Sequence, residues 1–298
     1  MDRFDLMTAF VAACEAQNLT AAARRLAVSP SVMSRQIAAL ESRLGARLFH
    51  RTTRQISLTD AGTRYLERAR RILGDLDEAE RAAQGESREP SGRLSVTAPL
   101  IFGRLHVAPL LARFLQRYPQ VSVELMLSDR FVNLVEEGHD LAIRIGHLPD
   151  SQLIARRFGE TRRALVASPS YLAKAGTPHH PDDLSHHDTI AFVLGTPPFD
   201  WHFNDKSAVL SVSLSPRILT NSGDTAIALA HDGVGIARAL YYQVRDAVNE
   251  GRLVEVLAAF APEPIPIHAV YPSARFLSSK VRSCIEMVAE MADWHFAS

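Results

Sequence analysis

The sequence predicts an α/β protein that begins with a helical head, and three of its stretches support this prediction. Residues 19–44 have the pattern of two short helices joined by a tight turn, and residues 60–83 have the pattern of one long helix. From residue 94 onward, apolar runs with the spacing of strands alternate with runs that have the spacing of helices. This alternation is typical of an α/β fold with largely parallel sheets.

The first of these stretches reads LTAAARRLAVSPSVMSRQIAALESRL. Thr20 can accept a hydrogen bond from the free N–H groups at the start of its first helix. Ser29 suits the N-cap of the second helix, and Pro30 suits that helix's first turn, where a missing N–H costs nothing. Apolar side chains then recur at steps of three and four, which predicts one buried stripe made of Met33, Ile37, Leu40 and Leu44.

The opposite face of that second helix carries small polar side chains and one arginine. A helix with such a face can enter the major groove of DNA and reach base edges and phosphates together. An ordinary helical hairpin with a solvated face would show the same pattern. The contacts to DNA that this stretch predicts are Thr20, Ser29, Pro30, Ser31, Ser34 and Arg35.

The flanking residues favour the DNA-binding interpretation. Residues 4–14 form a helical apolar stripe that could cover the two helices, and residues 48–59 alternate like a short hairpin with arginines at its tip. A basic hairpin beside a recognition helix can grip the DNA backbone or minor groove. Residues 1–60 hold eight arginines against five acidic residues, a net charge of +3, whereas the whole chain nets zero. The predicted contacts of the hairpin are Arg51, Thr52 and Arg54.

Two segments, LTAAARRLAVSPSVMSRQIAALESRLGARLFHRTTRQISLTDAG and PSGRLSVTAPL, resemble the LysR-type transcriptional regulators. The resemblance runs over essentially the full chain. One departure is Ser29-Pro30-Ser31, where the family most often has Ser-Gln-Pro, and this departure concerns base readout rather than docking. The resemblance implies a winged helix-turn-helix head, a linker helix that dimerises, and a periplasmic-binding-protein-like effector domain with two α/β lobes.

The same resemblance implies where the domains begin and end. Its helix-turn-helix core would lie at residues 19–38, and the chain would cross from the first lobe to the second and back. The expected boundaries are 1–60 for the head, 61–84 for the linker helix, 85–92 for a hinge, and 93–298 for the effector-binding domain, with lobe I at 93–161 and 267–298 and lobe II at 162–266.

The long helix after the head has a seam of apolar and small residues at steps of three and four, over about three heptads. Such a seam predicts a coiled coil with a second subunit, since the rest of the helix is polar. A helix packed on its own domain is the alternative. The residues expected in the dimer seam are Tyr65, Ala69, Ile72 and Leu76.

Ligands of open α/β sheets bind beyond the carboxyl ends of the strands. Several such ends carry polar or glycine residues, and one leads into a helix near residue 225, whose N–H groups could hold an anion. Ordinary turn chemistry explains each of these ends as well, and Trp201 and His202 equally suit packing or an edge-strand surface. The predicted contacts to the effector are Ala98, Pro99, Ile101, Ser128, Arg130, Gly146, His147, Trp201, His202, Asn221, Ser222 and Gly223.

Motifs for metals, cofactors and catalysis do not stand out. The histidine pairs at 179–180 and 186–187 fall in a loop without a cysteine at a zinc spacing. Gly233-Val234-Gly235 lacks the third glycine of a dinucleotide loop and follows a helix instead of a strand. We therefore expect no catalytic residues, no metal ligands, no cofactor and no enzymatic activity.

The sequence contains no run of about 20 apolar residues, and it opens without the layout of a signal peptide. Cys14 and Cys284 lie in apolar helical patterns, which favours free thiols and a cytoplasmic location. The prediction is a homodimeric or homotetrameric transcription regulator that binds double-stranded promoter DNA, responds to a small organic anion or polar metabolite, and contacts RNA polymerase. The alternative is a two-lobed solute-binding receptor without regulatory DNA binding, against which residues 1–60 argue.

Overall fold

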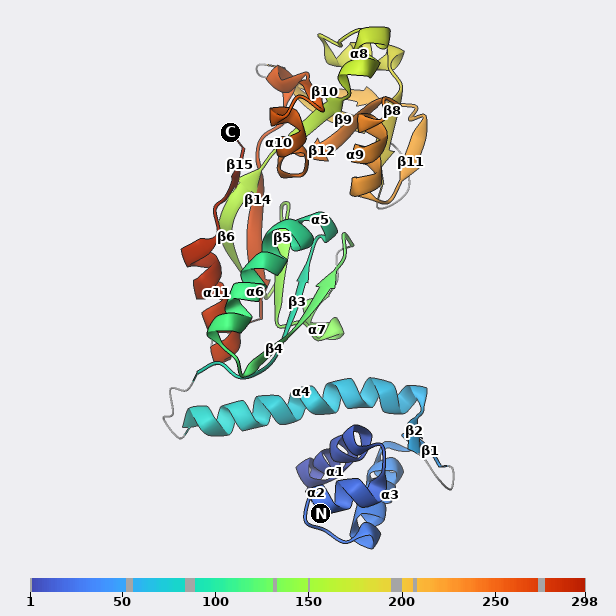
Figure 1. Cartoon of the computed structure of the whole chain (residues 1–298), viewed down its shortest axis with the longest axis vertical. Coiled ribbons are helices and arrows are strands. Elements are labelled where there is room, and N and C mark those ends of the chain that lie inside the picture. Colours follow the sequence, from blue (N-terminus) through green and yellow to red (C-terminus); the bar gives the residue numbers. More distant parts are fainter. Residues whose placement is uncertain are drawn as a thin grey trace. The chain divides into compact units, whose positions relative to one another are not determined.

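Two units make up the chain, residues 1–88 and residues 89–298 (Figure 1). The structure, a computed structural model, describes residues 2–51, 56–83, 89–130, 133–149, 151–193, 200–205, 208–272 and 277–297. In this part of the chain, no helix is both long enough and apolar enough to span a membrane.

The first unit contains the head and one long helix. Three helices pack around a shared apolar core, and a two-stranded antiparallel hairpin follows them. This is a winged helix-turn-helix, in which the second and third helices form the helix-turn-helix and the hairpin forms the wing. Its elements are α1 (Arg3–Ala16), α2 (Leu19–Arg25), α3 (Pro30–Leu44), β1 (Phe49–Arg51), β2 (Ile56–Leu58) and α4 (Asp60–Ala83).

Side chains at the helix ends explain where α2 and α3 begin. The Asn18 side chain accepts hydrogen bonds from the N–H groups of Thr20, at 2.8 Å, and Ala21, at 3.1 Å. The prediction that Thr20 caps this helix is therefore wrong, because the helix begins two residues earlier than that cap requires and Asn18 fills the cap. The Ser29 hydroxyl accepts from the N–H of Val32 at 3.3 Å, and Pro30 lies in the first turn, as predicted.

One face of α3 lies in the core of the head. Met33, Ile37 and Leu40 are at most 2% exposed and pack with residues of α1, as the spacing predicts. Leu44 is 41% exposed, so its place in the stripe is corrected. It is the last helical residue before Gly45, whose left-handed backbone (φ 65°) ends the helix.

The first half of α4 packs on the head. A Cβ atom at Gly62 would lie 2.1 Å from the Leu48 carbonyl oxygen, so the two segments approach as closely as glycine allows. The Tyr65 ring meets the edge of the Phe10 ring at 5.4 Å, and Ala69 is completely buried. Ala69 is therefore already covered within its own unit, which corrects its place in the dimer seam, whereas Tyr65 keeps part of its surface exposed and stays a predicted seam residue.

In the second unit, lobe I is built on a six-stranded sheet with the order β15-β6-β14-β5-β3-β4. Strand β3 is parallel to β4 and β5, whereas β14 is antiparallel to β5 and β6. The sheet is mixed instead of largely parallel, because β14 brings the chain back from lobe II in the opposite direction. Its strands are β3 (Gly92–Ala98), β4 (Val121–Leu127), β5 (Leu141–Ile145), β6 (Ile154–Thr161), β14 (Ile265–Tyr271) and β15 (Trp294–Phe296).

Helices cover this sheet and complete its core. One helical stretch runs from residue 100 to residue 117, and its backbone takes a π-helical turn just before Pro109. This turn displaces the side chains that follow it around the helix. The helical segments of lobe I are α5 (Leu100–Phe102), η1 (Gly103–Val107), α6 (Ala108–Arg117), α7 (Leu134–Glu137) and α11 (Ser279–Met291).

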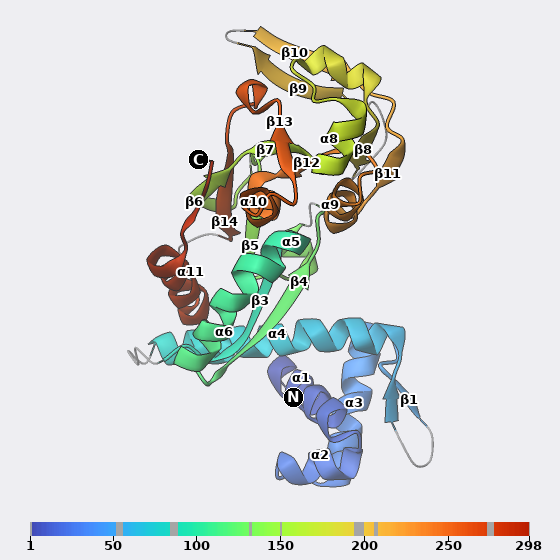
Figure 2. The ribbon, with the colours of Figure 1, turned by 45° about the horizontal axis from the view of Figure 1, so that its top comes forward.

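Lobe II is built on a five-stranded sheet with the order β11-β8-β12-β7-β13. One apolar core joins this sheet to α8 and to a separate antiparallel hairpin, and a second joins it to α9 and α10 (Figure 2). The strands are β7 (Arg163–Ala167), β8 (Thr189–Phe192), β9 (Asp200–Asp205), β10 (Ala208–Ser213), β11 (Ile218–Thr220), β12 (Ile236–Leu240) and β13 (Val254–Val256). The helical segments are α8 (Pro169–Ala175), η2 (Pro181–His186), α9 (Gly223–His231), α10 (Tyr241–Asn249) and η3 (Ala258–Phe260).

Candidate DNA-binding surface and effector site

The face of α3 opposite its buried stripe is exposed and polar. Ser31, Ser34 and Arg35 all lie on it. The hydroxyls of Ser31 and Ser29 lie 2.9 Å apart at the start of the helix, and Arg35 is one turn further along. Arg35 forms no ion pair with any residue that the structure describes. Thr20 and Pro30 are also exposed, so every residue predicted in this stretch can be reached from solvent.

The wing is held against α3 by a residue that the sequence analysis did not select. The Glu41 carboxylate, on α3, accepts hydrogen bonds from the N–H groups of Leu48, at 2.8 Å, and Phe49, at 3.2 Å. It thereby fixes the start of β1 relative to the recognition helix. The predicted contacts Thr52 and Arg54 lie outside the described residues, as does the side chain of Arg51.

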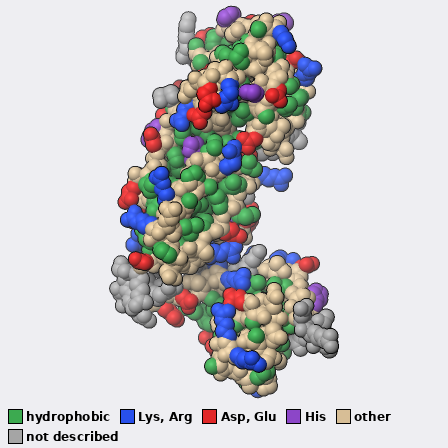
Figure 3. Space-filling view, viewed as in Figure 1, with side chains coloured by type: hydrophobic (Ala, Val, Ile, Leu, Met, Phe, Trp, Pro, Cys, Tyr) green, Lys and Arg blue, Asp and Glu red, His purple; other side chains and the backbone are tan. Residues whose placement is uncertain are grey.

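Basic side chains are visible on the surface of the head (Figure 3). An exposed helix face with an unpaired arginine, beside a short antiparallel wing, is the geometry with which winged helix-turn-helix proteins approach DNA.

The two lobes of the second unit meet where several predicted effector residues lie. A Cβ atom at Gly223 would be 3.0 Å from the Cδ1 atom of Ile101, and Arg104 of lobe I pairs with Asp224 of lobe II at 3.3 Å. In lobe I, the Ser128 N–H donates to the Ala98 carbonyl at 2.9 Å. The structure therefore brings the end of β3, the end of β4 and the start of α9 into one region.

Burial separates these residues into two kinds. Ala98 is completely buried and Ile101 is 4% exposed, so both belong to the core of lobe I here and present little surface to a ligand. Ser128 is partly exposed, and its hydroxyl accepts from the Arg130 N–H at 3.2 Å, as in an ordinary turn. The Ser222 hydroxyl caps α9 by accepting from the Thr225 N–H at 3.2 Å.

Gly146 and His147 lie at the end of β5, beside the returning strand. The Gly146 N–H donates to the Pro266 carbonyl at 3.0 Å, and its backbone has a φ of 133° that suits glycine. Burial lowers the pKa of the neighbouring His268, and the charges of Arg157 and His147 lower it further. The surroundings of this strand end therefore favour the neutral form of His268.

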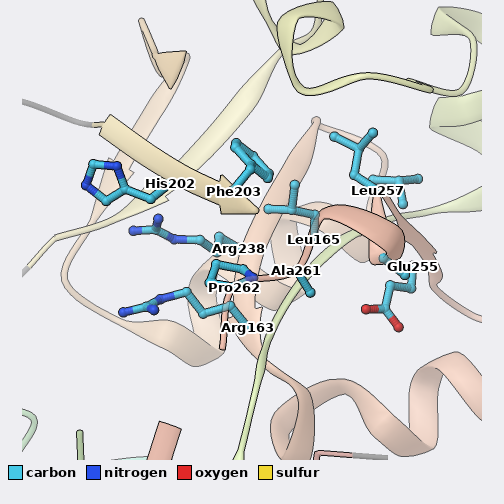
Figure 4. A pocket seen from close by; sticks show the side chains of 11 residues that line it. Arg163, Leu165, His202, Phe203, Arg238, Glu255, Leu257, Ala261 and Pro262 are labelled. Carbon is cyan, nitrogen blue, oxygen red and sulfur yellow. The ribbon is translucent and has the colours of Figure 1, made fainter. Parts of the chain in front are cut away.

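The two residues predicted from lobe II lie on β9. Trp201 is 2% exposed and packs in the core of lobe II. The prediction that it lines the effector cleft is therefore wrong, and the alternative of core packing is correct. His202 is exposed and lines a depression with Arg163 and Arg238 (Figure 4). His202 is the one predicted effector residue in the lining of this depression.

A winged helix-turn-helix head followed by two α/β lobes defines a ligand-responsive DNA-binding regulator. Two family descriptions match the chain: "Bacterial regulatory helix-turn-helix protein, lysR family" over residues 4–63, and "LysR substrate binding domain" over residues 87–293. The chain belongs to the LysR family of transcriptional regulators. It is a DNA-binding transcription regulator with an effector-binding domain, and the solute-receptor alternative is not favoured.

Known proteins of this family resemble the whole chain. The transcriptional regulator PtxR of Pseudomonas aeruginosa is 37% identical over 282 residues, covering 95% of this chain and 90% of PtxR. The structure of CrgA, a LysR-type regulator of Neisseria meningitidis, has 34% identity and a TM-score of 0.62, covering 97% of this chain and 99% of CrgA. The structure of the Vibrio cholerae virulence activator AphB has 28% identity and a TM-score of 0.62, covering 97% of this chain and 99% of AphB.

Proposed function

We propose that this regulator binds promoter DNA as a homodimer, or as a pair of dimers, through the exposed face of α3 and the wing. The observation that carries this proposal is the exposed arginine Arg35, which lies beside Ser31 and Ser34 without an ion pair among the described residues. An arginine there can form two parallel hydrogen bonds with guanine or phosphate. The proposed site of action is the cytoplasm, where promoter DNA and RNA polymerase are found together.

The second half of α4 supports the proposed dimer. Ile72 is 41% exposed, and it follows a first half that the head covers. The next apolar residue of the seam is Leu76, one turn further along, and acidic residues surround it in the sequence. An exposed isoleucine on an otherwise polar helix is typical of a coiled-coil seam.

For the effector, we propose a small organic anion or polar metabolite at the contact between the lobes. Ser222 and Gly223 begin α9, and free N–H groups at such a helix start attract a carboxylate. Ser128, Asn221, Ser222 and Gly223 are all partly or fully exposed in this region. A ligand that binds one arrangement of the lobes more tightly would shift the population of arrangements, and thereby the DNA affinity.

Two measurements test this proposal. Fluorescence anisotropy with duplexes from the DNA that flanks the gene should show saturable binding by the wild-type protein, and competition with unrelated DNA should be weak. A promoter reporter should then respond to at least one member of a panel of small carboxylates. Ser128→Trp should abolish that response and leave DNA binding intact, whereas Ser128→Ala should respond like the wild type. Full response in Ser128→Trp would place the effector elsewhere.

A further inference from the structure

Lobe II carries a depression on one face of its sheet, bordered by β9 and by the segment around η3 (Figure 4). It is a shallow, open hollow, because its empty space of about 290 Å³ includes solvent above the surface. Its lining combines apolar side chains with cations. The lining residues that matter here are Arg163, Leu165, His202, Phe203, Arg238 and Glu255.

The two arginines of this depression are neighbours in the sheet. Arg163 lies on β7 and Arg238 on β12, and these strands pair antiparallel, with Leu240 opposite Arg163 and Leu165 opposite Arg238. The arginines are therefore diagonal neighbours on one face, where long side chains reach each other. Figure 4 shows both guanidinium groups pointing to the same side of the depression, with the ring of His202 above them.

These two charges have no acidic partner among the residues that the structure describes. Glu255 also lines the depression, but Arg162 binds its carboxylate through two hydrogen bonds, one of them 3.0 Å long. Figure 4 shows the Glu255 carboxylate on the far side from both guanidinium groups. The sheet therefore brings two positive charges together and directs the nearby negative charge away from them.

Two neighbouring positive charges repel each other and destabilise the folded state unless a bound anion offsets the repulsion. Burial lowers the pKa of Arg163, and burial together with the charge of Arg163 lowers the pKa of Arg238 to about 10. The guanidinium carbon of Arg238 lies 5.1 Å from the centre of the Trp201 ring, a cation–π contact that fixes its position. Arg238 is half-buried, so water screens it less than it screens a surface arginine.

We propose that Arg163 and Arg238 form a binding site for a small oxyanion that carries two negative charges. Each guanidinium presents its N–H groups as a planar fork that matches the oxygens of a carboxylate, sulfate or phosphate, and two forks match a dianion. Leu165 and Phe203 supply an apolar wall beside them. An inorganic dianion and a short dicarboxylate share this chemistry. The inference goes beyond the effector site proposed above, whose residues at the lobe contact do not line this depression.

The first test measures binding to the full chain. Sodium phosphate, sulfate and malonate are titrated by calorimetry, with sodium chloride at matched ionic strength as the reference. At least one dianion should bind at one site per chain and raise the unfolding temperature as its concentration rises. Tighter binding of phosphate or sulfate identifies an inorganic dianion, and tighter binding of malonate identifies a dicarboxylate. If none of the three binds better than chloride, the proposal is overturned.

The second test uses variants. Arg238→Met and Arg163→Met should each weaken dianion binding about tenfold or more, and Arg238→Lys should weaken it less, because it keeps the charge without the fork. Arg217→Met is the control, since this exposed arginine of lobe II is paired with Asp188 at 2.8 Å. Its dianion binding should equal that of the wild type.

A third measurement separates a binding role from a structural one. Because methionine removes one of two like charges, Arg238→Met should unfold in chloride at a higher temperature than the wild type. A lower unfolding temperature together with unchanged dianion binding would show a purely structural arginine and overturn the proposal. Arg163 is exposed, so Arg163→Met tests the site even if Arg238→Met folds poorly. Operator binding without dianion should stay normal in both variants, which distinguishes this proposal from the one above.

Discussion

The head and lobe II both leave functional groups without partners, but they do so in opposite settings. On the head, Arg35 is exposed on α3, and beyond it Ile72 is 41% exposed on α4. In lobe II, the half-buried Arg238 lies beside Arg163 in a depression of about 290 Å³. A side chain on an open surface can be reached by another macromolecule, whereas a guanidinium set into a hollow of the sheet is reached most easily by a small ion or molecule.

The two settings also differ in how much an unpaired group reveals. An exposed arginine is hydrated, so leaving it unpaired costs little, and its role must be argued from the helix face and the family. The half-buried Arg238 has given up part of its hydration, so its missing acidic partner is itself informative.

Ile72→Glu should have the largest effect, because it would bury a carboxylate in the proposed dimer seam. An unpartnered buried charge costs about 3–5 kcal/mol, enough to dissociate the dimer at micromolar concentration. Sedimentation velocity measures the outcome, with Ile72→Leu as the matched control that keeps the seam apolar. A stable dimer with normal operator binding in Ile72→Glu would remove α4 from the interface, and a monomeric wild type would do so directly.

Arg35→Ala should weaken operator binding by about 1–3 kcal/mol, the usual cost of removing an arginine that binds a specific base. Fluorescence anisotropy checks this, and Arg43→Ala is the control, since Arg43 is exposed at the other end of the same helix. Dianion binding in lobe II should be unchanged in both variants. Equal operator affinity for Arg35→Ala and the wild type would contradict the assigned role of α3.

Replacing the wing arginines should weaken DNA binding less, and without regard to sequence. Replacing both Arg51 and Arg54 by alanine should weaken binding to every DNA sequence alike, because backbone contacts carry no sequence information. The slope of log affinity against log salt should flatten by about two units at most, one for each phosphate that the protein no longer binds. An unchanged slope would show that neither side chain touches the DNA backbone.

Much of the head could be predicted from the sequence because its signals are local. Ser29, Pro30 and the stripe from Met33 to Leu40 are set by neighbours within four residues, and the structure confirms them. The cap of α2 was missed because α1 and α2 are separated by a very short turn. Gln17 takes a left-handed conformation (φ 51°) to end α1, so α2 begins directly after Asn18.

Lobe II could be predicted less well because its site depends on distant pairing. Arg163 and Arg238 become neighbours through the antiparallel register of β7 and β12, which no local pattern encodes. The β9–β10 hairpin was also missed, although Trp201 and Phe203 alternate with polar residues in the manner of a strand. That alternation was the available signal, and it would have indicated Trp201 as a core residue.

Titration of His106 should have the smallest effect, which is a change in how stability depends on pH. It lies in the π-helical turn, where its ring contacts the tilted ring of Phe102 of lobe I, at 4.8 Å between centroids, and meets Tyr242 of lobe II edge-on, at 5.6 Å. Its Nε2 atom has no hydrogen-bond partner among the described residues. Burial lowers the pKa of His106, and the charge of Arg245 lowers it further.

Because the pKa of His106 is lowered in the folded state, the folded protein binds this proton only at a lower pH than the unfolded chain does. Its contribution to stability is therefore present above the ordinary pKa of about 6.5 and is lost as the pH falls below that value. His106→Phe keeps the stacking and removes the titrating group, so its unfolding temperature should fall less between pH 7.5 and pH 5.5 than that of the wild type. His186→Gln is the control, since His186 is exposed, and it should follow the wild type. Identical pH dependence in all three proteins would show that protonation of His106 does not oppose the contact between the lobes.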